Sequence, residues 1–152
     1  TLQYLLPELV EDIEELSDSL LAKGGALISA RRSLVHGDFH PEQLLSSGEE
    51  IILLDFDRSY AGDSVADLGN LCAHLIYRNL LGEGVDSDEL IPLFKDGYVR
   101  AGGIQLDSSA LAFWTALGLL NLAPTPFRSL KPNWPQLTIG LLEAFRRELA
   151  CI

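Results

Sequence analysis

The chain has 152 residues, of which 47% are hydrophobic and 22% charged, so it can form a single domain, residues 1–152, around a buried core. Its net charge of −11, with no cluster of basic residues larger than a pair, would repel a phosphate backbone and argues against nucleic-acid binding. Its two cysteines, Cys72 and Cys151, form neither a zinc motif nor a disulfide framework, which favours a cytoplasmic location.

The first predicted element is an amphipathic helix. Apolar residues recur at helical spacing from Leu2 to Leu21, and acidic residues occupy the remaining face, which we expect to be exposed. The helix should end at Gly24-Gly25, where a left-handed terminus causes no side-chain clash.

A loop and a β-hairpin are predicted next. The apolar pair that begins at Leu34 leads into a polar loop, residues 36–43. Two apolar segments then flank a Ser-Ser-Gly-Glu turn at residues 46–49, the pattern of a hairpin whose second strand ends at Leu54. A second loop, residues 55–63, follows.

Helices are predicted from there almost to the end. Asp63 is the expected N-cap of a helix that Gly82 ends, and Asp86 with Glu89 forms a capping-box pattern for a helix over residues 87–101.

Residues 111–122 are apolar nearly all round, which predicts a central buried helix. Pro124 and Pro126 break it, and a last helix runs to about Ala150. No apolar run approaches the length needed to cross a bilayer, so we expect no membrane contact.

Three oxygen-bearing side chains bracket the predicted hairpin: Asp38, Gln43 and Asp55. Folding the hairpin brings its two ends together, so these groups are expected to converge on one pocket that suits a hard cation. Phosphoryl transfer from ATP needs such a set, because a carboxylate accepts the proton of the substrate hydroxyl and oxygen ligands hold magnesium against the phosphates. Asp57 is assigned either to a place near the metal or to a surface pair with Arg58.

The motifs around the hairpin resemble those of the aminoglycoside phosphotransferase and choline kinase superfamily. His-Gly-Asp at residues 36–38, followed by Gln43, resembles the H-G-D-x-x-x-x-N catalytic loop. Residues 52–57 resemble the strand-borne metal-binding aspartate, and residues 62–68 resemble the G-D-P-x-x-D-L-A segment. The resemblance implies a mostly helical α+β fold, the C-terminal lobe of a protein-kinase-like fold, with small hairpins that carry the active site.

The resemblance also implies roles for single residues. Asp38 would be the catalytic base, and Gln43 and Asp55 would bind the Mg²⁺ that bridges the ATP phosphates. Gln43 replaces the family's asparagine with a longer side chain that offers the same oxygen, and maltokinases are similar in this respect, which favours a sugar acceptor. His36 and Asp67 are expected to support the catalytic loop through hydrogen bonds.

A metal-dependent phosphoesterase is a weaker interpretation. His36, Asp38 and His40 alternate as metal ligands on a strand do, but Pro41 interrupts the strand, and the D-x-H and G-N-H motifs of that family are absent.

A non-catalytic or degenerate kinase-like binding module is the other alternative, because the chain has no Gly-rich phosphate loop and no lysine on a strand pattern. We prefer a missing N-terminal ATP-binding lobe as the explanation, since the chain lacks methionine and begins with Thr1.

The expected reaction of the parent enzyme is transfer of the ATP γ-phosphate to a hydroxyl of a sugar, amino alcohol or aminoglycoside. The isolated chain should bind ATP poorly and turn over slowly or not at all. The wall of the acceptor site is expected from the helices after Asp63, near Tyr60, Trp114 and Phe127.

Overall fold

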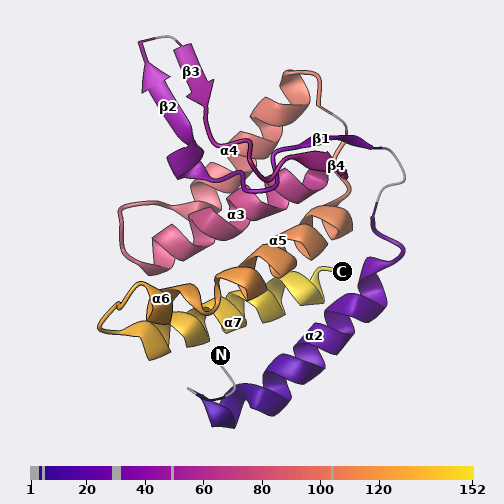
Figure 1. The fold of residues 1–152 in the computed structure, drawn as a ribbon. Coiled ribbons are helices and arrows are strands. Elements are labelled where there is room, and N and C mark those ends of the chain that lie inside the picture. Colours follow the sequence, from indigo (N-terminus) through magenta and orange to yellow (C-terminus); the bar gives the residue numbers. More distant parts are fainter. Residues whose placement is uncertain (1–3, 5, 29–31, 49, 104) are drawn as a thin grey trace.

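The computed structural model describes residues 4, 6–28, 32–48, 50–103 and 105–152. Figure 1 shows a group of packed helices with two small two-stranded antiparallel sheets on one side of it. The predicted mostly helical α+β class is confirmed.

The body of the protein consists of α3 (Val65–Leu80), α5 (Ser108–Leu122) and α7 (Trp134–Ala150). α5 lies between the other two (Figure 1) and buries side chains around its whole circumference, as predicted. Tyr77 and Phe145 pack against it from the two sides, so the core is centred on α5.

The stretch Ser108–Arg128 combines α5 with the short α6 (Thr125–Arg128). Within its 21 residues, an 18-residue window has a mean hydropathy of 1.2, which makes the stretch long and apolar enough to cross a membrane, contrary to the expectation from the sequence. More than half of that window, 56%, is buried inside the protein, where α5 packs against α3 and α7. The same length and composition therefore serve here to build the core.

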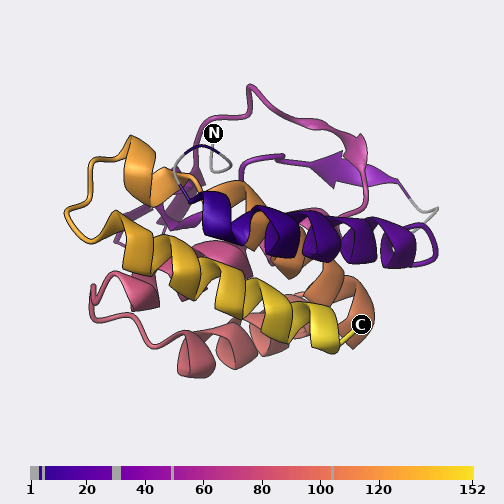
Figure 2. The ribbon, with the colours of Figure 1, turned by 90° about the horizontal axis from the view of Figure 1, so that it is seen from below.

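The first helix, α2 (Val10–Gly24), follows a short 3₁₀ turn, η1 (Pro7–Leu9). Figure 2 shows α2 beside α7 on the same face of the molecule. The guanidinium of Arg146 in α7 lies 2.7 Å from the carboxylate of Asp12, so an exposed ion pair adds to the apolar contacts between the helices.

α2 ends at Gly24 as predicted, but the predicted left-handed terminus is wrong, because Gly25 has φ −60. A Cβ on Gly24 would lie 2.6 Å from the ring of Phe113 in α5. Packing, and not backbone conformation, therefore requires this glycine. The predicted start of the helix at Leu2 lies outside the described residues.

Two antiparallel strand pairs frame the region that carries the motifs. β2 (Leu44–Ser47) and β3 (Glu50–Leu53) form the predicted hairpin, with the first residue of each strand opposite the last residue of the other. β1 (Ser33–Val35) pairs with β4 (Tyr60–Gly62), a pairing between distant segments that the sequence did not predict.

Aspartates lie at the starts of α3 and α4 (Ser87–Arg100). Asp86 caps α4, because its side chain accepts two backbone amides of the first turn, as predicted. At α3 the cap position is Ser64, one residue later than predicted, while the Asp63 carboxylate accepts the amide of Val65 at 3.1 Å.

Candidate active site

Two loops meet between the sheets: residues 36–43, which join β1 to β2, and residues 54–59, which join β3 to β4. Gly37 in the first loop has φ +80, and a Cβ there would clash with the backbone carbonyl of Arg58 in the second. The backbone conformation and the close approach both require glycine. The first two residues of the His-Gly-Asp motif thus lie where the loops touch.

His36 is buried and ties the first loop to the second. Its Nε2 lies 2.7 Å from the carbonyl oxygen of Leu54, and its Nδ1 lies 3.3 Å from the backbone nitrogen of Asp38. A neutral ring with its hydrogen on Nε2 satisfies both contacts, since it donates to Leu54 and accepts from Asp38. The hydrogen bonds predicted for His36 are present.

Asp67, in the first turn of α3, accepts hydrogen bonds from the backbone of the first loop. One of its carboxylate oxygens accepts the backbone amide of His36 at 2.7 Å, and the other accepts that of Gly37 at 3.0 Å. The predicted contact of Asp67 with the loop backbone is confirmed. Since both oxygens are engaged, this carboxylate is committed to positioning the loop.

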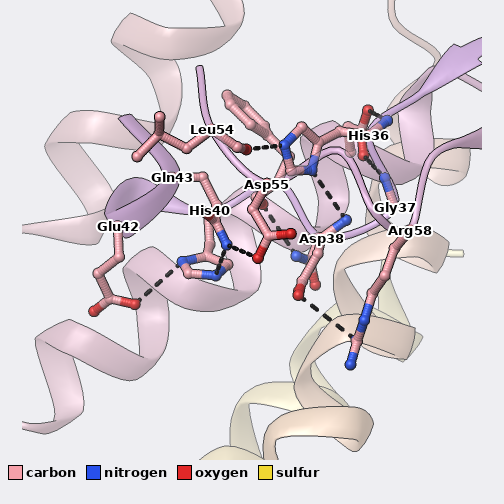
Figure 3. Close-up of polar contacts among 12 residues, drawn as sticks. His36, Gly37, Asp38, His40, Glu42, Gln43, Leu54, Asp55 and Arg58 are labelled. Atoms are coloured by element: carbon pink, nitrogen blue, oxygen red, sulfur yellow. Dashed lines mark hydrogen bonds and ion pairs between the residues drawn. The ribbon is translucent and has the colours of Figure 1, made fainter. Parts of the chain in front are cut away.

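The two predicted metal ligands face each other across the base of the hairpin. Nε2 of Gln43 lies 3.5 Å from Oδ2 of Asp55, and the backbone amide of Leu54 donates to the carbonyl of Gln43 at 2.9 Å. Asp55 is exposed and has φ +60, a strained conformation for a non-glycine residue that is often found at functional sites. Figure 3 shows the two side chains pointing toward one another.

Asp38 is joined to the second loop by an ion pair. Its Oδ2 lies 3.6 Å from Nη1 of Arg58, three residues after Asp55, and the Asp38 side chain is 30% exposed. Arg58, the surface partner considered for Asp57, thus pairs with Asp38. Asp38, Gln43 and Asp55 all lie around the junction of the two loops (Figure 3).

The donor set of Gln43 and Asp55 fits magnesium. An amide carbonyl and a carboxylate are hard oxygen ligands, and Mg²⁺ at nucleotide sites takes few protein ligands and completes its coordination with water and phosphate oxygens. Both side chains are at least partly open to solvent, so that further ligands have access.

The geometry does not favour a phosphoesterase. Within the part of the chain that the structure describes, no group of three or more His, Cys, Asp or Glu side chains is placed to hold a metal ion. The ring of His36, a ligand in that interpretation, is occupied by Leu54 and the loop backbone.

A cavity of about 170 Å³ borders the first loop, and Gly37 and Asp67 form part of its wall. Tyr60 and Trp114, two of the three aromatic residues named for the expected acceptor wall, line this cavity. Phe127 does not, because its ring packs edge-on against Trp134 at 5.2 Å.

Two asparagines in this cavity wall were not predicted from the sequence. Asn70 lies on α3 and Asn121 on α5, and Asn70 also donates to the backbone carbonyl of Phe39 in the first loop at 3.0 Å. Asn70 is half-buried and Asn121 is exposed, so no burial pattern in the sequence marked either of them.

His40, which contacts Gln43, and His74, which stacks on His40, were given no role in the predicted kinase site. The rings of His40 and His74 stack with centroids 4.5 Å apart and planes at 13°. Nε2 of His40 lies 3.2 Å from Nε2 of Gln43, and its Nδ1 lies 3.1 Å from the carboxylate of Glu42. Burial lowers the pKa of His74 to about 4, with a further lowering from His40.

Comparison with known proteins places the chain in a family. Proteins named "Probable bifunctional tRNA threonylcarbamoyladenosine biosynthesis protein" are similar to the chain: that of Methanosarcina barkeri (strain Fusaro / DSM 804) is 31% identical over 100 residues, and that of Methanosarcina acetivorans is 30% identical over 98. These alignments cover 65% and 64% of the chain but only 16% of each relative, so the chain corresponds to a small part of their length. No solved structure was found to match. The model of the phosphotransferase enzyme family matches residues 1–114, three quarters of the chain, and the chain belongs to this family.

Proposed function

We propose that the chain is the C-terminal, catalytic lobe of an ATP-dependent kinase that phosphorylates a hydroxyl group. The observation that carries the proposal is the meeting of Asp38, Gln43 and Asp55 around one junction between two loops, in a chain that belongs to a phosphotransferase family. The acceptor oxygen attacks the γ-phosphorus, the bond to the β–γ bridging oxygen breaks, and ADP leaves. The hydroxyl proton passes to the carboxylate of Asp38.

Gln43 and Asp55 are the residues proposed to hold Mg²⁺, through the amide carbonyl and the carboxylate. When bound, the ion neutralises charge on the phosphates. Asp57, exposed two residues after Asp55, is a further candidate for the surroundings of the metal.

His36 and Asp67 support the base indirectly. Asp67 fixes the amides of two successive loop residues, and His36 accepts the amide of Asp38 itself. These bonds restrict the backbone from which the Asp38 carboxylate projects, which preorganises the base.

ATP binding is proposed to need an N-terminal lobe that is not part of this chain. The hairpin supports this idea, because its apolar side chains remain open to solvent: Ile51 is 73% exposed and Leu45 is 51% exposed. Exposed apolar surface of this kind is expected to be covered by a partner or ligand. We therefore expect the chain alone to bind ATP weakly.

A small hydroxyl-bearing molecule is the acceptor that the site supports best. The cavity beside Gly37 offers the amides of Asn70 and Asn121 and the ring of Trp114, groups that suit a sugar. Asp67 is the carboxylate among its lining residues, and both of its oxygens are engaged, which favours a neutral acceptor over a cationic amino alcohol or aminoglycoside.

A role in tRNA modification is the second candidate, and it rests on the names of the relatives. The net charge of −11 argues against direct contact between this lobe and tRNA, so such a role would need RNA-binding segments elsewhere. ATP turnover measured with sugars, amino alcohols, aminoglycosides and tRNA separates the two candidates.

The test of the proposed base is Asp38→Asn in the protein that carries this chain. Loss of the proton acceptor should lower kcat for ADP formation by about 10²–10⁴-fold. Asp96→Asn is the matched control, because Asp96 forms an exposed ion pair with Arg100 on α4. Equal activity of the two variants would rule out Asp38 as the base.

A further inference from the structure

We propose that His40 is a positioning residue that orients the side-chain amide of Gln43, so that the carbonyl oxygen is the end left free for the cation. The inference rests on the proposed function, because it takes Gln43 as a metal ligand. It assigns His40 a role that is exerted through the side chain of Gln43.

The contact between the two side chains has only one consistent hydrogen-bond assignment. It joins Nε2 of Gln43, which can only donate, to Nε2 of His40 at 3.2 Å. The imidazole nitrogen must therefore be unprotonated. The ring hydrogen then lies on Nδ1, which is 3.1 Å from the Glu42 carboxylate in an electrostatic contact without hydrogen-bond geometry.

An amide ligand needs such an orienting partner, because its two ends differ. Only the carbonyl oxygen of Gln43 can ligate a cation, yet the amide nitrogen is the end that lies 3.5 Å from Asp55. The shorter contact to His40 holds the nitrogen, whereas the contact to Asp55 is at the limit of a hydrogen bond. The NH₂ group carries two hydrogens, so both contacts hold the nitrogen, and the contact to His40 keeps it engaged and the oxygen free when the Asp55 carboxylate turns to a cation.

The position of His40 is itself fixed from two sides. The backbone amide of Gln43 donates to the carbonyl of His40 at 3.0 Å, which closes the turn η2 (Pro41–Gln43) and keeps both residues in register. On the other side the His40 ring lies nearly parallel to that of His74 in α3, and its side chain is only 13% exposed. A buried and stacked ring is well suited to set the direction of a hydrogen bond.

Manganese binding to this chain tests the inference without any turnover. His40→Phe keeps a flat ring against His74 and removes the acceptor nitrogen, so the Kd for Mn²⁺, measured from the electron paramagnetic resonance signal of the free ion, should rise by about 10-fold. His74→Phe is the matched control, since it keeps the stack and the acceptor, and its Kd should equal that of the wild type. Circular dichroism checks that each variant is folded.

A second pair of variants, made with Gln43→Glu, separates an effect of His40 on amide orientation from an effect on packing alone. Gln43→Glu presents two equivalent oxygens, so His40→Phe should not change Mn²⁺ affinity in that background. A loss of equal size in both backgrounds, or no loss in the wild-type background, would overturn the inference. If the wild-type chain binds no Mn²⁺, both the metal site and this inference fail.

The metal-free chain provides a second measurement. Long-range ¹H–¹⁵N correlation spectra should show His40 with its hydrogen on Nδ1, and the side-chain NH₂ signals of Gln43 should shift in His40→Phe. A hydrogen on Nε2 would refute the inference whether or not the protein transfers phosphate. Conversely, the predicted tautomer without phosphotransfer would count against the proposed function alone.

Discussion

Single residues divide the candidate site into a buried half that supports the loop and an open half that is proposed to react. His36 is 4% exposed and Asp67 has both oxygens bound to the loop backbone, whereas Asp55 is exposed and Asp38 partly so. This division follows from the chemistry, because the supporting hydrogen bonds are stronger away from water and the reacting groups must admit a substrate.

His74 should make stability depend on pH. Its pKa falls from 6.5 to about 4 in the folded protein, chiefly because the ring is buried. The nearby His40 lowers this pKa further, and Asp38 raises it. The unfolded chain binds a proton first as the pH falls, so the free energy of unfolding drops between pH 6.5 and 4, by at most about 3 kcal/mol.

Urea unfolding of the wild type and of His74→Gln at several pH values measures this effect. The variant carries no titrating group at position 74, so its stability should fall less over the same window, while the many carboxylates of the chain affect both proteins equally. Parallel pH profiles would show that His74 is not responsible.

At the scale of elements, features that depend on local sequence patterns were predicted, whereas contacts between distant segments were not. The hairpin, the cap at Asp86 and the buried helix α5 follow from turn residues, capping residues and hydrophobicity, which act within a few positions. The pairing of β1 with β4 and the stacking of His40 on His74 join segments far apart in sequence, and no local signal specifies them.

The end of α2 shows where the local rule failed. Two adjacent glycines suggested a left-handed terminus. Gly24 is required because a Cβ there would clash with the ring of Phe113, whereas a Cβ on Gly25 would meet no atom within 4 Å. Gly24→Ala should lower the free energy of unfolding by about 1–3 kcal/mol through overpacking. Gly25→Ala, at φ −60, should raise it by about 0.4–1 kcal/mol.

Chemical denaturation of the two variants provides a matched comparison, because the substitutions are identical and adjacent. Opposite signs support the packing argument. Equal effects would mean that the ring of Phe113 moves aside or that the helix end differs in solution.

The whole molecule carries a net charge of −11, and its acidic residues repel one another more in the compact state than in the unfolded chain. Sodium chloride screens this repulsion. The midpoint of thermal unfolding should therefore rise between low and physiological ionic strength at pH 7. A midpoint that falls with added salt would indicate that favourable ion pairs, such as Arg146 with Asp12, outweigh the net repulsion.

One helix touches the first loop at three points. Asp67 binds the amides of residues 36 and 37, Asn70 binds the carbonyl of residue 39, and His74 stacks on the ring of residue 40. These three residues are spaced by three and four positions, which is one face of α3. Any displacement of α3 along its axis would therefore move the backbone around the proposed base and the neighbourhood of Gln43 together, so that one helix couples the two parts of the candidate site.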